Sequence, residues 1–155
     1  MSAPEERLAE LGLALPDVAA PVAAYTPAVR TGDLVWTSGQ LPNVDGKLVA
    51  TGKVGDAVDP EAAKGYAQTC ALNALAAVKS LVGDLDKVRR VVKVVGFVAS
   101  APEFTGQPGV INGASDLLNQ VFGDAGVHAR SAVGVAVLPR DAPVEVEIVV
   151  EVDPA

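Results

Sequence analysis

Two residues near the end of the chain have the chemistry expected of a site for a small carboxylic acid. Arg130 stands at the start of an apolar segment, and Glu145 lies on the apolar segment that follows it. A guanidinium group offers a planar fork of N–H donors that matches a carboxylate at two points. A glutamate in the same pocket can orient or deprotonate a water molecule. The pair therefore indicates a site for a small molecule that carries a carboxylate.

Two predicted strands position these side chains. Residues 131–137 alternate branched with small side chains, which indicates tight packing on the small face, and residues 144–152 alternate apolar with mostly acidic ones. A turn between the strands reverses the chain. Folded back as neighbours, they place Glu145 level with about residue 135, roughly 16 Å from Arg130 along the strand axis. The two side chains then cannot share a small ligand within one subunit, and we expect Glu145 to come from a neighbouring copy.

The rest of the pattern predicts a βββαβαββ order behind a short N-terminal helix. Ser2 and Glu5 have the spacing of a capping box, and Asp59 followed by Pro60 is typical of a helix start. The predicted elements are a helix to about residue 11, an extended segment over 13–21, strands over 25–30, 34–38, 47–50 and 88–100, a long alanine-rich helix between Asp59 and Gly83, and a helix from about 108 to 122.

These elements predict an α+β fold with two layers, in which a mixed six-stranded sheet carries both helices on one face. In a chain of 155 residues nothing remains to cover the other face, so we expect copies to assemble through it with closed cyclic symmetry. We divide the chain into an N-terminal helical and extended extension over residues 1–23 and one domain over residues 24–155.

Composition argues against several classes of function. A net charge of −7 with scattered basic residues disfavours nucleic-acid binding. With one cysteine and one histidine, the chain lacks the ligand spacing of a zinc site, and we expect neither a metal nor a cofactor. We interpret Cys70 as a core residue. No apolar run suits a membrane span and no signal core opens the chain, so we expect a cytoplasmic protein.

Several short motifs occur in the order typical of one known family. They are Tyr25, Thr-Ser-Gly-Gln-Leu-Pro at 37–42, Ala-Arg-Ser at 129–131, Leu-Pro-Arg-Asp at 138–141 and Val-Glu-Val-Glu at 144–147. Each is weak alone, but their joint order and spacing resemble the Rid family, the reactive intermediate deaminases also called YjgF. The resemblance implies a chorismate-mutase-like fold assembled as a homotrimer, with three sites between subunits.

The resemblance also implies an activity and a set of residue roles. Well-studied members hydrolyse enamine and imine intermediates such as 2-aminoacrylate to 2-oxo acids and ammonia. By the resemblance, Arg130 binds the substrate carboxylate, Glu145 orients the attacking water, and Tyr25 donates a hydrogen bond or closes the pocket. The implied substrate-binding set is Gly39, Ser38, Arg130 and Ala132, with Gly39 and Ala132 acting through backbone groups.

Other interpretations of the same residues stay open. Arg130 could pair with an acidic residue at an interface, and Glu145 could be an ordinary solvent-facing strand residue. A second function is then a non-catalytic trimeric module that binds a small carboxylate metabolite or a protein partner. A third is a ribonuclease, which the acidic charge and the lack of a histidine pair oppose. His128 stands where the family commonly has proline, and we interpret it as structural; we expect Trp36 in the core or at an interface.

Overall fold

The computed structural model describes residues 2–18 and 24–155. Residues 19–21 of the predicted extended segment and residues 22–23 at the end of the predicted N-terminal extension lie outside the described residues. The helices are α1 (Ala3–Glu10), α2 (Pro60–Val82) and α3 (Gln107–Phe122), and the strands are β1 (Ala28–Thr31), β2 (Leu34–Thr37), β3 (Asn43–Val44), β4 (Lys47–Leu48), β5 (Val88–Ala99), β6 (Ala129–Val135) and β7 (Val144–Val152), with 3₁₀ turns η1 (Leu85–Lys87), η2 (Gly123–Gly126) and η3 (Pro139–Asp141).

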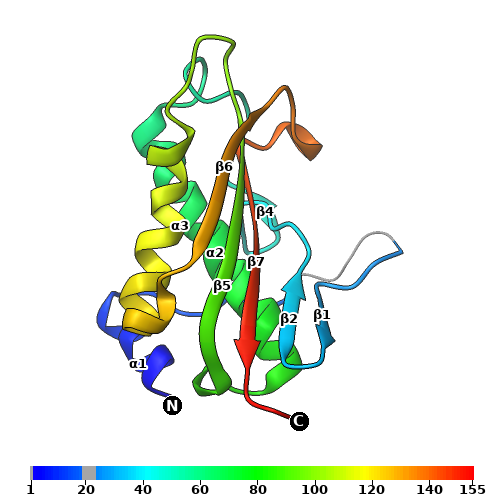
Figure 1. The fold of residues 1–155 in the computed structure, drawn as a ribbon. Helices are drawn as coiled ribbons and strands as arrows, with labels where there is room; N and C mark the ends of the chain where they lie inside the picture. The colour runs from blue at the N-terminus through cyan, green and yellow to red at the C-terminus, as the bar shows by residue number, and fades with distance from the viewer. Residues whose placement is uncertain (1, 19–23) are drawn as a thin grey trace.

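The main sheet has the strand order β1-β2-β7-β5-β6, and only the β5–β6 pair is parallel. Helices α2 and α3 pack side by side on one face of it (Figure 1). The predicted α+β arrangement of two layers is therefore confirmed. Strands β6 and β7 run in opposite directions, as predicted, but β5 lies between them, so the expectation that they are neighbours is wrong.

The described residues form a main sheet of five strands, not the predicted six. The strand expected over 47–50 is the short β4, which pairs with β3 in a separate hairpin. Asp45 and Gly46 close this hairpin with φ values of 51° and 77°. Positive φ at both central residues is typical of the tight two-residue turn. The local turn therefore pairs β4 with the preceding residues and leaves it out of the main sheet.

The core lies between the sheet and the helices because the strand residues alternate. On β7 the even-numbered residues from Val144 to Val152 are buried and the odd-numbered ones face the other way. The alanines of α2 pack against this surface, and Gly113 of α3 lies against the backbone carbonyl of Lys64, where any side chain would collide. Cys70 is fully buried, as predicted, and burial raises the pKa of its thiol.

Helix α1 is joined to this core, although not through the predicted capping box. The Ser2 side chain makes no capping hydrogen bond, and the Glu5 carboxylate instead pairs with Lys79 of α2. Leu8 is 1% exposed within the core, and Arg7 donates to the carbonyl of Val121 at 2.8 Å. No helix in the described ranges combines the length and apolar character needed to cross a bilayer.

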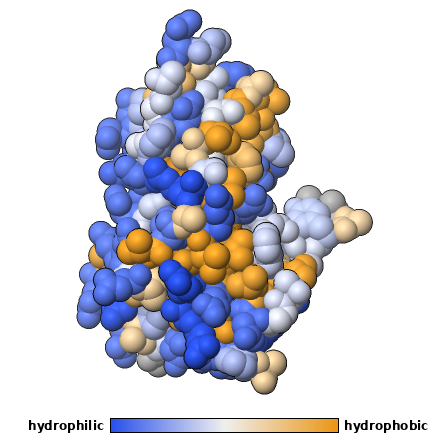
Figure 2. Space-filling view, viewed as in Figure 1, coloured by the Kyte–Doolittle hydropathy of each residue, from blue (hydrophilic) through white to orange (hydrophobic). Residues whose placement is uncertain are grey.

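The second face of the main sheet carries exposed apolar side chains that no described element covers. Trp36 is 50% exposed, and Val29 and Val133 are 53% and 44% exposed. Figure 2 shows apolar residues forming a band across the middle of this face. We call this face of the main sheet, which lies opposite α2 and α3, the open face. Trp36 therefore lies outside the core of the subunit, and its position at an interface stays a prediction.

Candidate functional site

Arg130 lies on β6, the strand at one edge of the main sheet, and its side chain reaches the helix layer. Its Nη1 donates to Asn112 Oδ1 at 2.7 Å and to Ser115 Oγ at 3.2 Å. Asn112 and Ser115 are three residues apart on α3, so they project from the same side of that helix. The two acceptors therefore hold one end of the guanidinium group.

The other edge of the guanidinium group has no such partner. Among the described residues, Arg130 makes no ion pair, and its hydrogen bonds are made through Nη1 to neutral oxygens. Nε and Nη2 together form the second two-point donor edge of an arginine. Among the described residues the side chain thus has no acidic partner and keeps one donor edge unpaired; that this edge binds a carboxylate stays a prediction.

His128 has two partners, although the sequence suggested none. Its Nε2 lies 2.9 Å from Ser115 Oγ, and its Nδ1 lies 2.6 Å from the carbonyl oxygen of Gly126. Asn112, Ser115 and His128 therefore form one polar group with Arg130, of which sequence reasoning identified only the arginine. The one sequence signal for the additional members was the polar pair Asn112 and Ser115, three positions apart in the helix predicted from about 108 to 122.

Glu145 lies on β7 and projects from the side opposite to its buried neighbours Val144 and Val146. Its carboxylate occupies the space where a Cβ on Gly39 would stand. Glycine is thus required at position 39 because a side chain there would collide with the Glu145 carboxylate. This is in addition to the backbone role that the resemblance implies. Ser38, next to it, donates from Oγ to the carbonyl of Thr26 at 2.7 Å.

The surroundings of Glu145 make its carboxyl a better proton acceptor than an exposed one. Burial raises the pKa of Glu145, and the negative charge of Glu147 on the same strand raises it further. Both causes disfavour the charged form. A carboxyl with a raised pKa can take a proton from water and return it, which is what general acid–base catalysis near neutral pH requires.

The predicted site residues fall into two groups. Ala132 follows Arg130 on β6 and projects from the same face of the strand, with its side chain partly buried against the core. Ser38 and Gly39 lie with Glu145, and Tyr25, which is 53% exposed, precedes the Thr26 carbonyl that Ser38 contacts. The Arg130 group is thus Arg130, Ala132, Asn112, Ser115 and His128, and the Glu145 group is Glu145, Gly39 and Ser38, which Tyr25 adjoins through the neighbouring Thr26.

The two groups do not meet within one subunit. On β5, Arg130 is level with Val94 and Glu145 is level with Phe97, which also pairs with Val133. Glu145 is therefore level with residue 133, not 135 as predicted, and about 10 Å from Arg130 along the strands. The two residues also lie two strand spacings apart, about 4.8 Å each, and on opposite faces of the sheet. One small ligand cannot contact both side chains of the same chain.

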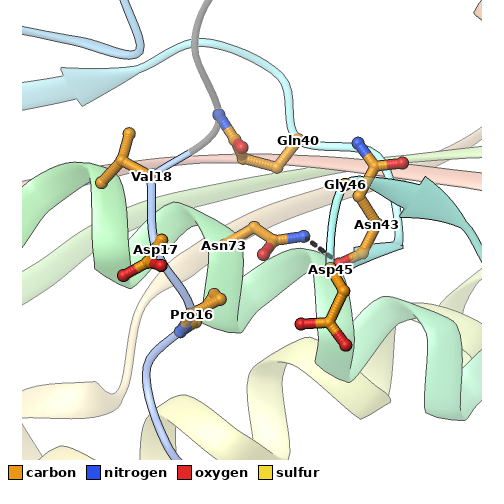
Figure 3. A pocket seen from close by; sticks show the side chains of 8 residues that line it. All are labelled: Pro16, Asp17, Val18, Gln40, Asn43, Asp45, Gly46 and Asn73. Atoms are coloured by element: carbon orange, nitrogen blue, oxygen red, sulfur yellow. Dashed lines mark hydrogen bonds between the residues drawn. The ribbon is translucent and has the colours of Figure 1, made fainter.

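A cavity of about 360 Å³ lies elsewhere, beside the β3–β4 hairpin, and contains none of these residues (Figure 3). Asn73 of α2 contributes to its wall and donates to the carbonyl of Asn43 at 3.1 Å. The full lining is Pro16, Asp17, Val18, Gln40, Asn43, Asp45, Gly46 and Asn73. Two aspartates and no basic residue would repel a carboxylate. The candidate site is therefore the pair of groups above.

The described residues also contain no group of three or more His, Cys, Asp or Glu side chains arranged for a metal ion. What the Arg130 and Glu145 groups offer is a carboxylate receptor and a proton acceptor.

Comparison with known proteins places this arrangement in a family. Residues 5–152 match the family described as "YjgF/chorismate_mutase-like, putative endoribonuclease". Protein TCP17 of Trypanosoma cruzi is 46% identical over 147 residues, with 94% of this chain and 92% of that protein covered. A 2-iminobutanoate/2-iminopropanoate deaminase of Dermatophagoides farinae is 32% identical over 134 residues, with 86% and 89% covered.

Solved structures agree with the fold. The crystal structure of Atu1372, a protein of unknown function from Agrobacterium tumefaciens, has a TM-score of 0.91 and 51% identity, covering 97% of this chain and 94% of that one. The sequence match, the relatives and the shared α+β fold lead to one conclusion: this chain belongs to the YjgF family, also known as the Rid family.

Proposed function

We propose that this protein hydrolyses small enamine or imine intermediates that carry a carboxylate, such as 2-aminoacrylate, to 2-oxo acids and ammonia. The observation that carries the proposal is the Arg130 guanidinium, held at Nη1 by neutral oxygens with its Nε–Nη2 edge available. The relative of Dermatophagoides farinae named as a 2-iminobutanoate/2-iminopropanoate deaminase supports the choice of reaction.

The proposed reaction uses few groups. Arg130 binds the substrate carboxylate in two-point fashion, with the Gly39 amide as a second donor to it. Glu145 takes a proton from water as the oxygen attacks the imine carbon. The same proton goes to the imine nitrogen and gives a carbinolamine. The remaining hydroxyl proton then passes through Glu145 to the nitrogen as the C–N bond breaks and C=O forms, so that imine and water give a 2-oxo acid and ammonia. Tyr25 donates a hydrogen bond or closes the pocket.

The proposal includes a homotrimer, because the two groups lie apart within one chain. The open face carries Trp36, Val29 and Val133 at its surface, and their burial between copies would stabilise an assembly. Closed threefold symmetry would bring the Arg130 group of one copy to the Glu145 group of the next, once at each of three interfaces.

Replacement of Arg130 by alanine tests the proposal. An imino acid is generated freshly in the assay, and formation of the 2-oxo acid is measured. We expect kcat/KM to fall at least 100-fold in Arg130→Ala, since a charge-assisted two-point contact stabilises by about 3 kcal/mol or more. The matched control is Arg90→Ala, which removes an exposed arginine from the neighbouring strand β5.

Two outcomes would contradict parts of the proposal, the first the role of Arg130 and the second the deaminase activity. Turnover of Arg130→Ala at the wild-type rate would show that the guanidinium does not bind substrate. Absence of turnover in the wild-type protein, with binding of 2-oxo acids retained and lost in Arg130→Ala, would instead support the non-catalytic carboxylate-binding module.

A further inference from the structure

We propose that Ser115 and His128 are positioning residues that orient Arg130 for its ligand. The proposal rests on the proposed function, since it concerns how the carboxylate receptor is held. Three side chains and one carbonyl form a continuous chain of hydrogen bonds: Arg130 to Ser115, Ser115 to His128, and His128 to Gly126.

The groups at the two ends of the chain set the direction of its bonds, since a carbonyl oxygen only accepts and a guanidinium only donates. The Gly126 carbonyl oxygen can only accept, so His128 Nδ1 must carry a hydrogen and donate it at 2.6 Å. In the tautomer with its hydrogen on Nδ1, Nε2 holds a lone pair and accepts the hydroxyl hydrogen of Ser115 at 2.9 Å. Arg130 Nη1 can only donate, so Ser115 Oγ accepts from it at 3.2 Å. His128 thus fixes the direction of the Ser115 hydroxyl and with it the lone pair that faces the guanidinium.

The fixed acceptor matters because a guanidinium can rotate. Nη1 has two hydrogens, and Asn112 Oδ1 accepts one at 2.7 Å while Ser115 Oγ accepts the other. With both directions defined, the plane of the group is fixed and its Nε–Nη2 edge points in one direction. An arginine side chain has about 2 kcal/mol of rotamer entropy, and prior ordering reduces what ligand binding must restrict.

The same contacts could suggest a serine nucleophile with a histidine base, but burial argues against it. Ser115 is 8% exposed and projects from α3 into the space between the helix and β6. A substrate carbon would have to reach an oxygen whose lone pair already faces Nη1. The geometry therefore assigns a role through Arg130 and not direct contact with the substrate.

The test separates binding from chemistry. Ser115→Ala removes the acceptor, and His128→Phe removes the group that directs it. We expect each to raise KM for a carboxylate-bearing imine about five- to tenfold with kcat within twofold, as loss of one hydrogen bond to a charged group predicts. The corresponding imine with a neutral amide in place of the carboxylate should show no change. Ser80→Ala, on α2, is the matched control.

A conservative variant gives a readout that a purely structural role would not. In His128→Gln the amide oxygen can accept from Ser115 and the amide nitrogen can donate to Gly126, so KM should return to within twofold of wild type. Ser115→Cys is nearly isosteric but a weak acceptor, and it should raise KM as Ser115→Ala does. It provides the test if the alanine or phenylalanine variant does not fold.

Failure of this proposal is distinguishable from failure of the proposed function. Unchanged KM in Ser115→Ala, Ser115→Cys and His128→Phe, with the Arg130→Ala effect intact, overturns the positioning role and leaves the deaminase standing. Equal KM rises for the carboxylate and amide substrates also overturn it. Absence of 2-oxo acid formation by the wild-type protein rejects the proposed function itself, whereas an unchanged kcat/KM in Arg130→Ala rejects the role of Arg130 in it.

Discussion

The Arg130 group and the Glu145 group are built on opposite physical principles. Arg130 is held by neutral acceptors on α3 that leave its charge without an acidic partner among the described residues, and one donor edge is unpaired. Glu145 is destabilised in its charged form by burial and by Glu147. The first group therefore favours binding of a charge, whereas the second favours uptake of a proton, and a hydrolase of imino acids needs both.

The position of each group in the sheet explains why neither is complete alone. β6 is an edge strand whose arginine turns toward the helices, whereas β7 is a central strand whose glutamate turns toward the open face. The division of roles across the sheet predicts that function depends on contact between copies.

The largest expected effect follows from preventing that contact. Trp36→Glu places a charge on the apolar open face, and we expect a monomer with deaminase activity at background, since charge burial in an apolar interface is strongly unfavourable. Size-exclusion chromatography with light scattering measures the assembly. Leu81→Glu is the matched control, because Leu81 is similarly exposed, at 45%, but lies on α2. A fully active Trp36→Glu monomer would contradict the division between copies.

A mixed trimer sharpens the comparison. Arg130→Ala and Glu145→Gln chains with different affinity tags are co-expressed, and trimers that hold both are purified through both tags. In any such trimer one interface pairs the intact arginine with the intact glutamate, so activity should recover to about a third of wild type. Each variant alone, carried through the same procedure, stays at background. If every site belonged to one chain, the mixture would show no recovery.

Gly39→Ala affects the Glu145 group alone. The new Cβ occupies the space of the Glu145 carboxylate and displaces it. A displacement of about 1 Å lowers kcat by roughly 10- to 100-fold, with a smaller change in KM. Gly65→Ala is the matched control, because nothing lies within 4 Å of its added methyl group and alanine suits a helix. Equal kcat values for Gly39→Ala and Gly65→Ala would contradict the proposed catalytic role of Glu145.

The smallest expected effect is on stability and its pH dependence. Because the pKa of Glu145 is raised in the folded state, the folded protein binds the proton more tightly than the unfolded chain. Stability due to this group is fully present below the ordinary pKa of a glutamate and is lost as pH rises through the raised value. Glu145→Gln should therefore be more stable than wild type above that window, as urea unfolding at several pH values measures. A constant difference across the whole range would contradict the pKa shift.

Much of the architecture follows from local patterns. The alternation over Val144–Val152 predicts β7 and its buried face correctly, and the alanine-rich segment between Asp59 and Gly83 predicts α2. Asp59 accepts from the amides of Glu61 and Ala62, as expected of a helix cap. These features depend on residues within a few positions of one another, so the sequence suffices to predict them.

The site itself was only partly predictable. Arg130, Glu145 and Gly39 stand out by residue type and motif, but Asn112 and Ser115 resemble ordinary polar positions on a helix. Their role appears only when α3 packs beside β6 and brings them to within hydrogen-bond distance of the arginine. His128 likewise acquires its partners from η2 and α3, one of which is thirteen positions away in the chain.

The sequence by itself indicated most of the elements, the family and the two candidate residues Arg130 and Glu145, since periodicity and motifs depend on neighbouring positions. Only the tertiary structure decided that β5 separates β6 from β7, and that Arg130 and Glu145 face opposite sides of the sheet. Strand order results from hydrogen bonding and burial between distant segments, which compete over the whole chain. No local pattern encodes the outcome of that competition.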